Sequence, residues 1–281
     1  MRKRILVIGT DPGLAHRLET HAPLAGCTVE ACPGNVEAVV RLRSRSYEVI
    51  VTDPDTTCHE DLALLAETAR LRPGVRFIAR APSTAPQDVI QAMRGRVFAC
   101  FSAPFDDNAI AAMVENAIES TDWRDSIELI SGSPHWVTLR VSSRLVTAER
   151  LVQFMKEYRS DLPADQRDEL MLAFREVLVN AMEHGAGFDP EKVVVVTAAR
   201  TQRAIVYHFR DPGPGFDPHA VTHAAIGNPP EDPLAHVEAR AQRGMRPGGF
   251  GILIAKQLVD ELVYNERGNE VLLIKYTDGR S

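Results

Sequence analysis

The chain has 281 residues, an apolar share of 44%, a charged share of 25% and a formal net charge of −6. This composition is typical of a soluble globular protein with room for two domains. Acidic and basic residues are spread over both halves, so no basic surface predicts binding to nucleic acid or to an anionic membrane. No apolar run reaches the ~20 residues of a membrane span, and the apolar run that follows the basic start is too short for a signal peptide. We therefore expect a cytoplasmic protein.

Strand-like apolar runs alternate with amphipathic helical patterns in residues 1–120. The expected strands are residues 4–10, 28–32, 47–53, 75–80 and 97–103, with clear helical stretches at 61–71 and 108–120. Such alternation indicates a parallel sheet with helices on both faces. Five strands in this length predict an α/β flavodoxin-like, doubly wound domain, whose crevice lies at the carboxyl ends of the strands.

The pattern changes after a predicted linker, residues 121–134, where Ser, Asp, Gly and Pro interrupt the periodicity. For the second domain, residues 135–281, we expect strands at 135–142, 192–200 and 204–211, helices at 147–160, 165–184 and 250–259, and a closing hairpin at 260–276. This order predicts an α+β fold, with helices on one face of a mostly antiparallel sheet.

The helix at 165–184 carries polar side chains along the edge of its apolar face. The apolar positions at helical spacing are Leu170, Phe174, Val177, Leu178 and Ala181. Glu176 and Asn180 are one turn apart, so they project side by side, and Glu183 and His184 continue that edge. Gly185 is placed to end the helix. The pair alone also fits a solvated stripe, so its interpretation depends on the rest of the chain.

Two glycine-rich segments follow in contexts that suit a nucleotide. In "DPGPGF", Asp211 follows an apolar strand and can accept a hydrogen bond from an exocyclic amine, while Gly213 and Gly215 allow the backbone close to a flat ligand. In "RPGGFGILIA", three glycines (Gly248, Gly249 and Gly251) open a helix, whose free N–H groups suit a polyphosphate. Residues 216–247 between them are long enough to form a functional lid or a disordered segment.

The segments "EVLVNAMEHG", "DPGPG" and "PGGFG" resemble the N, G1 and G2 boxes of the Bergerat-fold ATPases, the superfamily of gyrase, the histidine kinases and MutL. Their spacing is most similar to the anti-sigma-factor serine kinases of bacterial partner switching. The resemblance, over about residues 133–277, implies a Bergerat ATPase fold with an ATP–Mg²⁺ site. Asp211 would read adenine, Asn180 would hold Mg²⁺, and Glu176 would be the general base. The remaining ATP-binding positions would be His184, Gly213, Gly215, Gly248, Gly249 and Gly251.

This resemblance implies a protein serine kinase that phosphorylates a small antagonist protein of the STAS type. It would control a sigma factor or another target in signal transduction, and it would act as a homodimer. The alternative is a non-catalytic ATP-binding interaction module in a two-component-like pathway. A histidine kinase is disfavoured, because residues 106–146 are too short and too broken for the helical hairpin that carries a phosphoacceptor histidine.

Residues 2–120 resemble response-regulator receiver domains in strand rhythm. Asp53 falls at the phosphoacceptor position, and "APF" at 103–105 resembles the Lys-Pro-Phe of that family. However, Gly9 and Thr10 replace the acidic pair that holds Mg²⁺. Likewise Arg80 replaces the switch Thr or Ser, and Ala103 replaces the lysine. Without cation and lysine the charge on a phosphoryl group is poorly compensated, so we predict a pseudo-receiver in which Asp53 is at most a vestigial phosphoacceptor.

Overall fold

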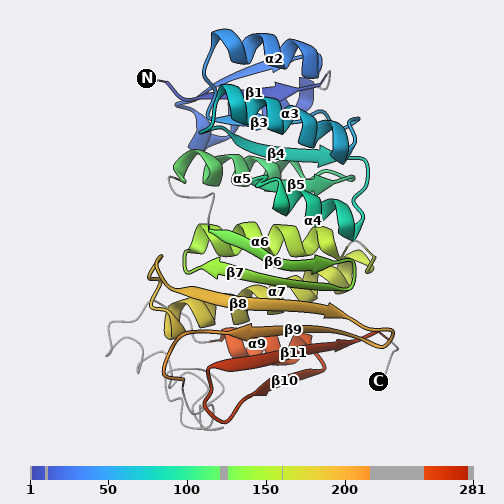
Figure 1. The fold of residues 1–281 in the computed structure, drawn as a ribbon, viewed down its shortest axis with the longest axis vertical. Helices are drawn as coiled ribbons and strands as arrows, with labels where there is room; N and C mark the ends of the chain where they lie inside the picture. Colours follow the sequence, from blue (N-terminus) through green and yellow to red (C-terminus); the bar gives the residue numbers. More distant parts are fainter. Residues whose placement is uncertain (1, 10–11, 121–125, 160, 216–249, 278–281) are drawn as a thin grey trace. The chain divides into compact units, whose positions relative to one another are not determined.

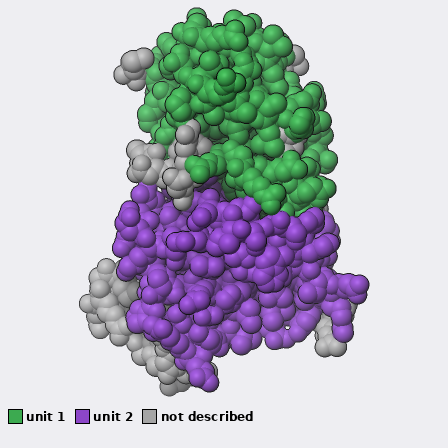
Figure 2. Space-filling view, in the orientation of Figure 1, with its two compact units in different colours: residues 1–124, 153–160 green, residues 125–152, 161–281 purple. Residues whose placement is uncertain are grey.

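The structure is a computed structural model that describes residues 2–9, 12–120, 126–159, 161–215 and 250–277. The chain forms two compact units (Figure 2). One comprises residues 1–124 and 153–160, and the other comprises residues 125–152 and 161–281. Helix α6 (Leu145–Tyr158) contributes residues to both units. Among the described residues, no helix is both long enough and apolar enough to cross a membrane.

The first unit is built on a five-stranded parallel sheet (Figure 1). Its strands are β1 (Arg4–Ile8), β2 (Thr28–Cys32), β3 (Val49–Val51), β4 (Arg76–Ala81) and β5 (Ala99–Ser102). Its helices are α1 (Pro12–Thr20), α2 (Asn35–Ser44), α3 (Cys58–Leu71), α4 (Pro86–Arg94) and α5 (Asp107–Glu119), with a 3₁₀ turn at Ala22–Leu24. The strand order β2-β1-β3-β4-β5 confirms the predicted flavodoxin-like fold.

Two helical layers bury this parallel sheet. Helix α1 packs beside α5, while α3 packs against both α2 and α4. The central strands are apolar on both faces, and the side chains of Ile5 to Ile8 and Val49 to Val51 are at most 1% exposed. Continuous apolar strands of this kind are what a parallel sheet covered on both faces requires.

The second unit is built on a six-stranded antiparallel sheet in the order β10-β11-β9-β8-β7-β6. Its strands are β6 (Ile127–Ser133), β7 (Trp136–Ser142), β8 (Val193–Arg200), β9 (Ala204–Arg210), β10 (Glu261–Tyr264) and β11 (Glu270–Tyr276). Helices α7 (Ala164–Asn180) and α9 (Gly251–Leu258) lie on one face of this sheet (Figure 1). The predicted α+β arrangement is confirmed.

Two features of the second unit differ from the expectation. Strand β6 lies inside the predicted linker 121–134 and pairs antiparallel with β7. Its Ser- and Gly-containing sequence is largely exposed, because an edge strand contributes little to the core. The helix expected over 165–184 is α-helical only to Asn180 and continues as a π-helical turn, η2 (Ala181–Gly185).

Candidate nucleotide-binding site

Aromatic packing fixes the position of helix α7 on the sheet. Phe174 meets Tyr207 edge to face, with ring centroids 4.8 Å apart, and lies 5.0 Å from the ring of Phe209. The apolar positions predicted for this helix face are all buried. Because this face is held on strand β9, Glu176 and Asn180 lie at its margin and are only partly buried.

The structure brings Glu176 and Asn180 together with the first residue of helix α9, Gly251. A Cβ atom at Gly251 would lie 2.4 Å from Glu176 Oε2 and 3.3 Å from Asn180 Nδ2. At 2.4 Å from the Glu176 oxygen, any residue other than glycine at position 251 would force the Glu176 carboxylate to move. The first N–H groups of a helix have no partner within the helix, so α9 presents hydrogen-bond donors beside a carboxylate and an amide. This grouping confirms the expectation that Gly251 opens a helix.

An ion-pair chain that the sequence analysis missed holds the Glu176 carboxylate. Arg175 lies 3.4 Å from Glu176 Oε1, and its guanidinium also contacts Glu149 Oε1 at 2.6 and 3.0 Å. Arg175 therefore ties α7 to α6 and orients Glu176, whose other oxygen faces Gly251. The only sequence signal was that Arg175 directly precedes Glu176. Periodicity places neighbouring residues about 100° apart on a helix and gave no reason to pair them.

Asp211 forms a second cluster with two glycines. It follows strand β9, and its Oδ1 accepts the backbone N–H of Gly213 at 2.8 Å. A Cβ atom at Gly185 would lie 2.1 Å from Asp211 Cγ, and one at Gly213 would lie 2.7 Å from the Gly185 Cα. Gly185 is thus required because the Asp211 carboxylate lies close to it, and Gly213 is required because the backbone of Gly185 lies close to it.

The contact with Asp211 gives Gly185 a second role besides ending the helix. The left-handed backbone near the end of the helix falls on Gly187, with a φ of 69°, and on Phe188, with a φ of 51°. Gly185 ends the π-helical turn. A glycine is needed there because any side chain would occupy the space of the Asp211 carboxylate. The three residues Gly185, Asp211 and Gly213 form one packed cluster between the helix end and the strand end.

The turn between β10 and β11 supports the Asp211 loop. The backbone N–H of Asp211 donates to the carbonyl of Asn269 at 3.1 Å. Gly215 has a φ of +84°, and a Cβ atom there would lie 1.8 Å from the Arg267 carbonyl oxygen. The structure thus explains Gly215 by packing on the chain's own backbone, and its expected contact with a ligand stays a prediction.

Burial sets the electrostatics of the Asp211 cluster. Partial burial raises the pKa of Asp211, although the Gly213 N–H and the Arg267 charge act in the opposite direction. Burial, and to a smaller extent the charge of Asp211, also raises the pKa of Tyr264, which the sequence analysis did not single out. A half-buried carboxylate with one oxygen engaged by a backbone N–H has its other oxygen as an acceptor for an amine. The contact of Asp211 with adenine stays a prediction.

The π-helical turn changes the expected position of His184. In this turn the N–H of Ala186 donates to the carbonyl of Ala181 at 3.1 Å, five residues back. The 3.6-residue period that placed His184 on the edge of Glu176 therefore does not apply beyond Asn180. His184 is exposed, and its contact with ATP stays a prediction. Gly248, Gly249 and the predicted lid at 216–247 lie outside the described residues.

In the first unit, the carboxyl ends of the strands are occupied by a buried arginine. Arg80 is 1% exposed. Its Nε donates to the Thr52 carbonyl at 2.8 Å, and one terminal nitrogen donates to the Ile8 carbonyl at 3.3 Å. Its guanidinium also lies 5.6 Å from the ring centroid of Phe105. A fixed cation thus sits at the ends of β1 and β3, which is where the crevice of this fold lies.

Asp53 lies in the same crevice. It follows strand β3, and its Oδ1 accepts the N–H of Asp55 at 3.0 Å. Gly9 has a φ of +118°, and a Cβ atom there would be 3.3 Å from Asp53 Cγ, so the backbone after β1 lies against this carboxylate. Nearby, Asp61 is buried and accepts hydrogen bonds from the Thr52 and Thr56 hydroxyls. Desolvation raises the pKa of Asp61 to about 6.

Comparison with known proteins agrees with this division of the chain. Residues 141–275 match the family described as "Histidine kinase-like ATPase domain". Over 148 residues, half of this chain, the sequence is 25% identical to the transcriptional regulatory protein GlrR of Escherichia coli K12. The match covers 33% of GlrR, so the chain spans about a third of the length of the curated relatives it matches.

Solved structures similar to this chain include receiver domains. A CheY-like receiver domain protein from Methanospirillum hungatei is 17% identical and has a TM-score of 0.37, with coverage of 42% of this chain and 95% of its own. The pilus assembly protein CpaE from Caulobacter crescentus is 15% identical and has a TM-score of 0.37, with coverage of 41% and 92%.

The second unit therefore contains a domain of the histidine kinase-like ATPase family, and the first unit has a receiver-like fold. Mg²⁺ is typical of such domains, and the amide of Asn180 beside the start of α9 is a suitable oxygen donor for it, because Mg²⁺ is held by few protein oxygens besides phosphates and water.

Proposed function

We propose that this protein is an ATP-dependent protein serine kinase that phosphorylates a small antagonist protein and thereby controls a sigma factor or a similar regulatory target. The observation that carries the proposal is the meeting of Glu176 and Asn180 at the first residue of α9, Gly251. A carboxylate and an amide at a helix N-terminus combine a proton acceptor, a metal ligand and phosphate-binding N–H groups.

The two clusters would divide the work of the reaction. Asp211 accepts the exocyclic amine of adenine, which orients the substrate ATP with its phosphates toward α9. Asn180 holds Mg²⁺, which neutralises charge on the phosphate oxygens when bound. The serine oxygen of the partner forms a bond to the γ-phosphorus while the bond from that phosphorus to the β,γ-bridging oxygen breaks and ADP leaves. Glu176 takes the proton of the serine hydroxyl.

The ion pair with Arg175 supports this role for Glu176. A carboxylate that must accept a proton from a transient protein substrate has to be held in one orientation. Arg175, itself bound to Glu149 at 2.6 Å, contacts one oxygen of Glu176 and leaves the other on the side of Gly251. A purely structural carboxylate would not need to face the start of α9.

A second copy of the chain is the partner proposed for the sheet face of the second unit that the described helices α7 and α9 leave uncovered. Trp136, Ala199, Val206 and Ile274 lie in register across four neighbouring strands on the face away from α7 and α9. Trp136 is 50% exposed, and an open apolar face of this kind marks an association surface. Light scattering of the full chain at micromolar concentration should give twice the monomer mass of 31.0 kDa. A monomer mass at that concentration would reject the homodimer.

The kinase proposal is tested by transfer of label. The full chain would be mixed with γ-labelled ATP, Mg²⁺ and a STAS-type antagonist protein encoded beside its gene. We expect label on a serine of the antagonist that resists acid, because a phosphoserine ester survives acid whereas phosphohistidine does not. Acid-labile label on the chain itself would point to a histidine kinase. ATP binding with no transfer to the antagonist would favour the non-catalytic interaction module.

A further inference from the structure

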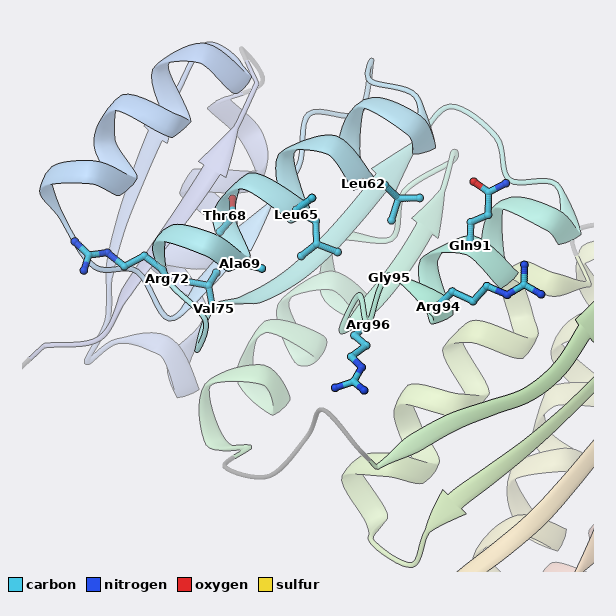
Figure 3. Close-up of a pocket in the computed structure, with 11 residues that line it drawn as sticks. Leu62, Leu65, Thr68, Ala69, Arg72, Val75, Gln91, Arg94, Gly95 and Arg96 are labelled. Carbon is cyan, nitrogen blue, oxygen red and sulfur yellow. The ribbon is translucent and has the colours of Figure 1, made fainter.

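An apolar groove lies between helices α3 and α4 of the first unit (Figure 3). Its volume is about 500 Å³. Leu62, Leu65, Ala66 and Ala69 line it from α3 and follow one another at helical spacing, so they form a stripe along that helix. In Figure 3, the leucines project from α3 toward the turn after α4. The groove thus follows a helix over about two turns.

A buried hydroxyl in the lining lacks a hydrogen-bond partner. Thr68 lines the groove and is 1% exposed, and its Oγ1 has no partner among the residues that the structure describes. A threonine in a helix usually bonds to a carbonyl of the preceding turn. The Thr68 hydroxyl has almost no exposed area, so it lies beneath the surface of the groove.

The rim of the groove is basic. Arg72, Arg94 and Arg96 belong to the lining, and the described lining residues include no carboxylate. The Arg72 side chain points toward α2, where its Nε donates to the Leu42 carbonyl at 3.2 Å (Figure 3). Arg72 and Arg94 lie at helix C-termini, where the helix dipole favours a cation. Arg96 lies outside any helix, with a φ of 58° that glycine adopts more easily, directly after Gly95. The helix dipole therefore accounts for the positions of Arg72 and Arg94, but not for that of Arg96.

We propose that this groove binds an acidic amphipathic helix of a partner protein. Ala66 and Ala69 let a helix backbone come close, and apolar side chains at i, i+3, i+4 and i+7 of that helix would pack between α3 and α4. Asp or Glu residues beside this face would meet Arg94 and Arg96 at the rim. The stripe of four residues along about two turns of α3 favours a helix over a compact small molecule.

The test uses the full chain and a labelled peptide of about 15 residues, or about four helical turns. The peptide has a Leu/Ala face and Glu elsewhere, and a matched peptide has Lys in place of Glu. We expect fluorescence anisotropy to show binding of the Glu peptide that weakens with salt, and at least roughly tenfold weaker binding of the Lys peptide. Ala69→Trp should fill the groove and abolish binding. Ala63→Trp, on the exposed side of the same helix outside this groove, should leave binding unchanged.

Charge reversal gives an independent comparison. Arg94→Glu should weaken binding of the Glu peptide and reduce its advantage over the Lys peptide, whereas Arg70→Glu, in the last turn of α3 but outside this groove, should not. No binding of the Glu peptide, or equal binding by the two tryptophan variants, would overturn the proposal. A lower oligomer mass for Ala69→Trp than for Ala63→Trp, with no peptide binding, would assign the groove to a second copy of the chain and also overturn it.

Discussion

A single methyl group at Gly185 should test whether Asp211 reads the nucleotide. In the substitution Gly185→Ala, the new Cβ would lie 2.1 Å from Asp211 Cγ and 2.2 Å from its Oδ1. Carbon atoms in contact normally lie about 3.5–4.0 Å apart. The carboxylate must therefore move by more than about 1 Å, and this displacement also breaks or bends the 2.8 Å hydrogen bond from Gly213.

The size of the effect follows from the bond that the displaced carboxylate would lose. A hydrogen bond to a charged group contributes about 1.5–3 kcal/mol, so the dissociation constant for ATP should rise roughly 10- to 150-fold. Overpacking itself destabilises a fold by about 1–3 kcal/mol, which the second unit should tolerate. Because the methyl group acts through Asp211, adding Gly185→Ala to Asp211→Ala should produce little further loss.

Calorimetric titration of the full chain with Mg–ATP measures this change. The matched control is Gly74→Ala, because a Cβ atom at Gly74 would meet nothing within 4 Å, and its ATP affinity should equal that of the wild type. Circular dichroism checks that the variants are folded. A folded Gly185→Ala protein with wild-type affinity for ATP would refute the assignment of Asp211 to adenine.

Three further predictions concern the metal and the first unit. Asn180→Ala should make ATP binding insensitive to Mg²⁺, and titrations with and without the ion check this; persistent Mg²⁺ dependence would assign the metal to other residues. Acetyl phosphate or beryllofluoride should leave the spectra of the chain unchanged because Arg80 fills the crevice; a saturable change lost in Asp53→Ala would contradict this. Burial raises the pKa of Asp61 to about 6, so its contribution to stability is present at low pH and is lost as pH rises from about 4 to about 6. Asp61→Asn should remove up to about 3 kcal/mol of that loss. Denaturant unfolding near pH 4.5 and near pH 7 measures the free energy of unfolding of both proteins; if its change with pH is the same in Asp61→Asn and in the wild type, the reasoning is wrong.

The elements with a periodic hydrophobic pattern were predictable from the sequence. The five apolar strands of the first unit and the buried face of α7 show strong periodicity, because burial on a sheet requires it. Strand β6 was missed because only a few of its side chains, among them Ile127 and Leu129, are even partly buried. The π-helical turn at Ala181–Gly185 was missed because one extra residue in a turn leaves no mark in hydrophobic spacing.

The candidate site was predictable where a residue type is required by chemistry. Glu176 and Asn180 drew notice by their helical spacing and Asp211 by its place at a strand end, and their assignment to a site came from the resemblance to the N, G1 and G2 boxes. The structure places Glu176 and Asn180 beside Gly251, and Asp211 beside Gly185. Their supports were not predictable. Arg175 binds Glu149, 26 residues away, and Asn269 reaches Asp211 only after the chain has formed β11, so both contacts depend on tertiary packing.

The measurement that tests the central claim most directly is single-turnover transfer by Glu176→Gln. Glutamine keeps the shape of the side chain and cannot take the serine proton, so ATP affinity should stay near that of the wild type while transfer to the antagonist falls by about 10²–10⁴-fold. Arg175→Gln, which loosens the orientation of Glu176, should give a smaller loss. If Glu176→Gln phosphorylates the antagonist at the wild-type rate, Glu176 is not the base and the proposed mechanism is wrong.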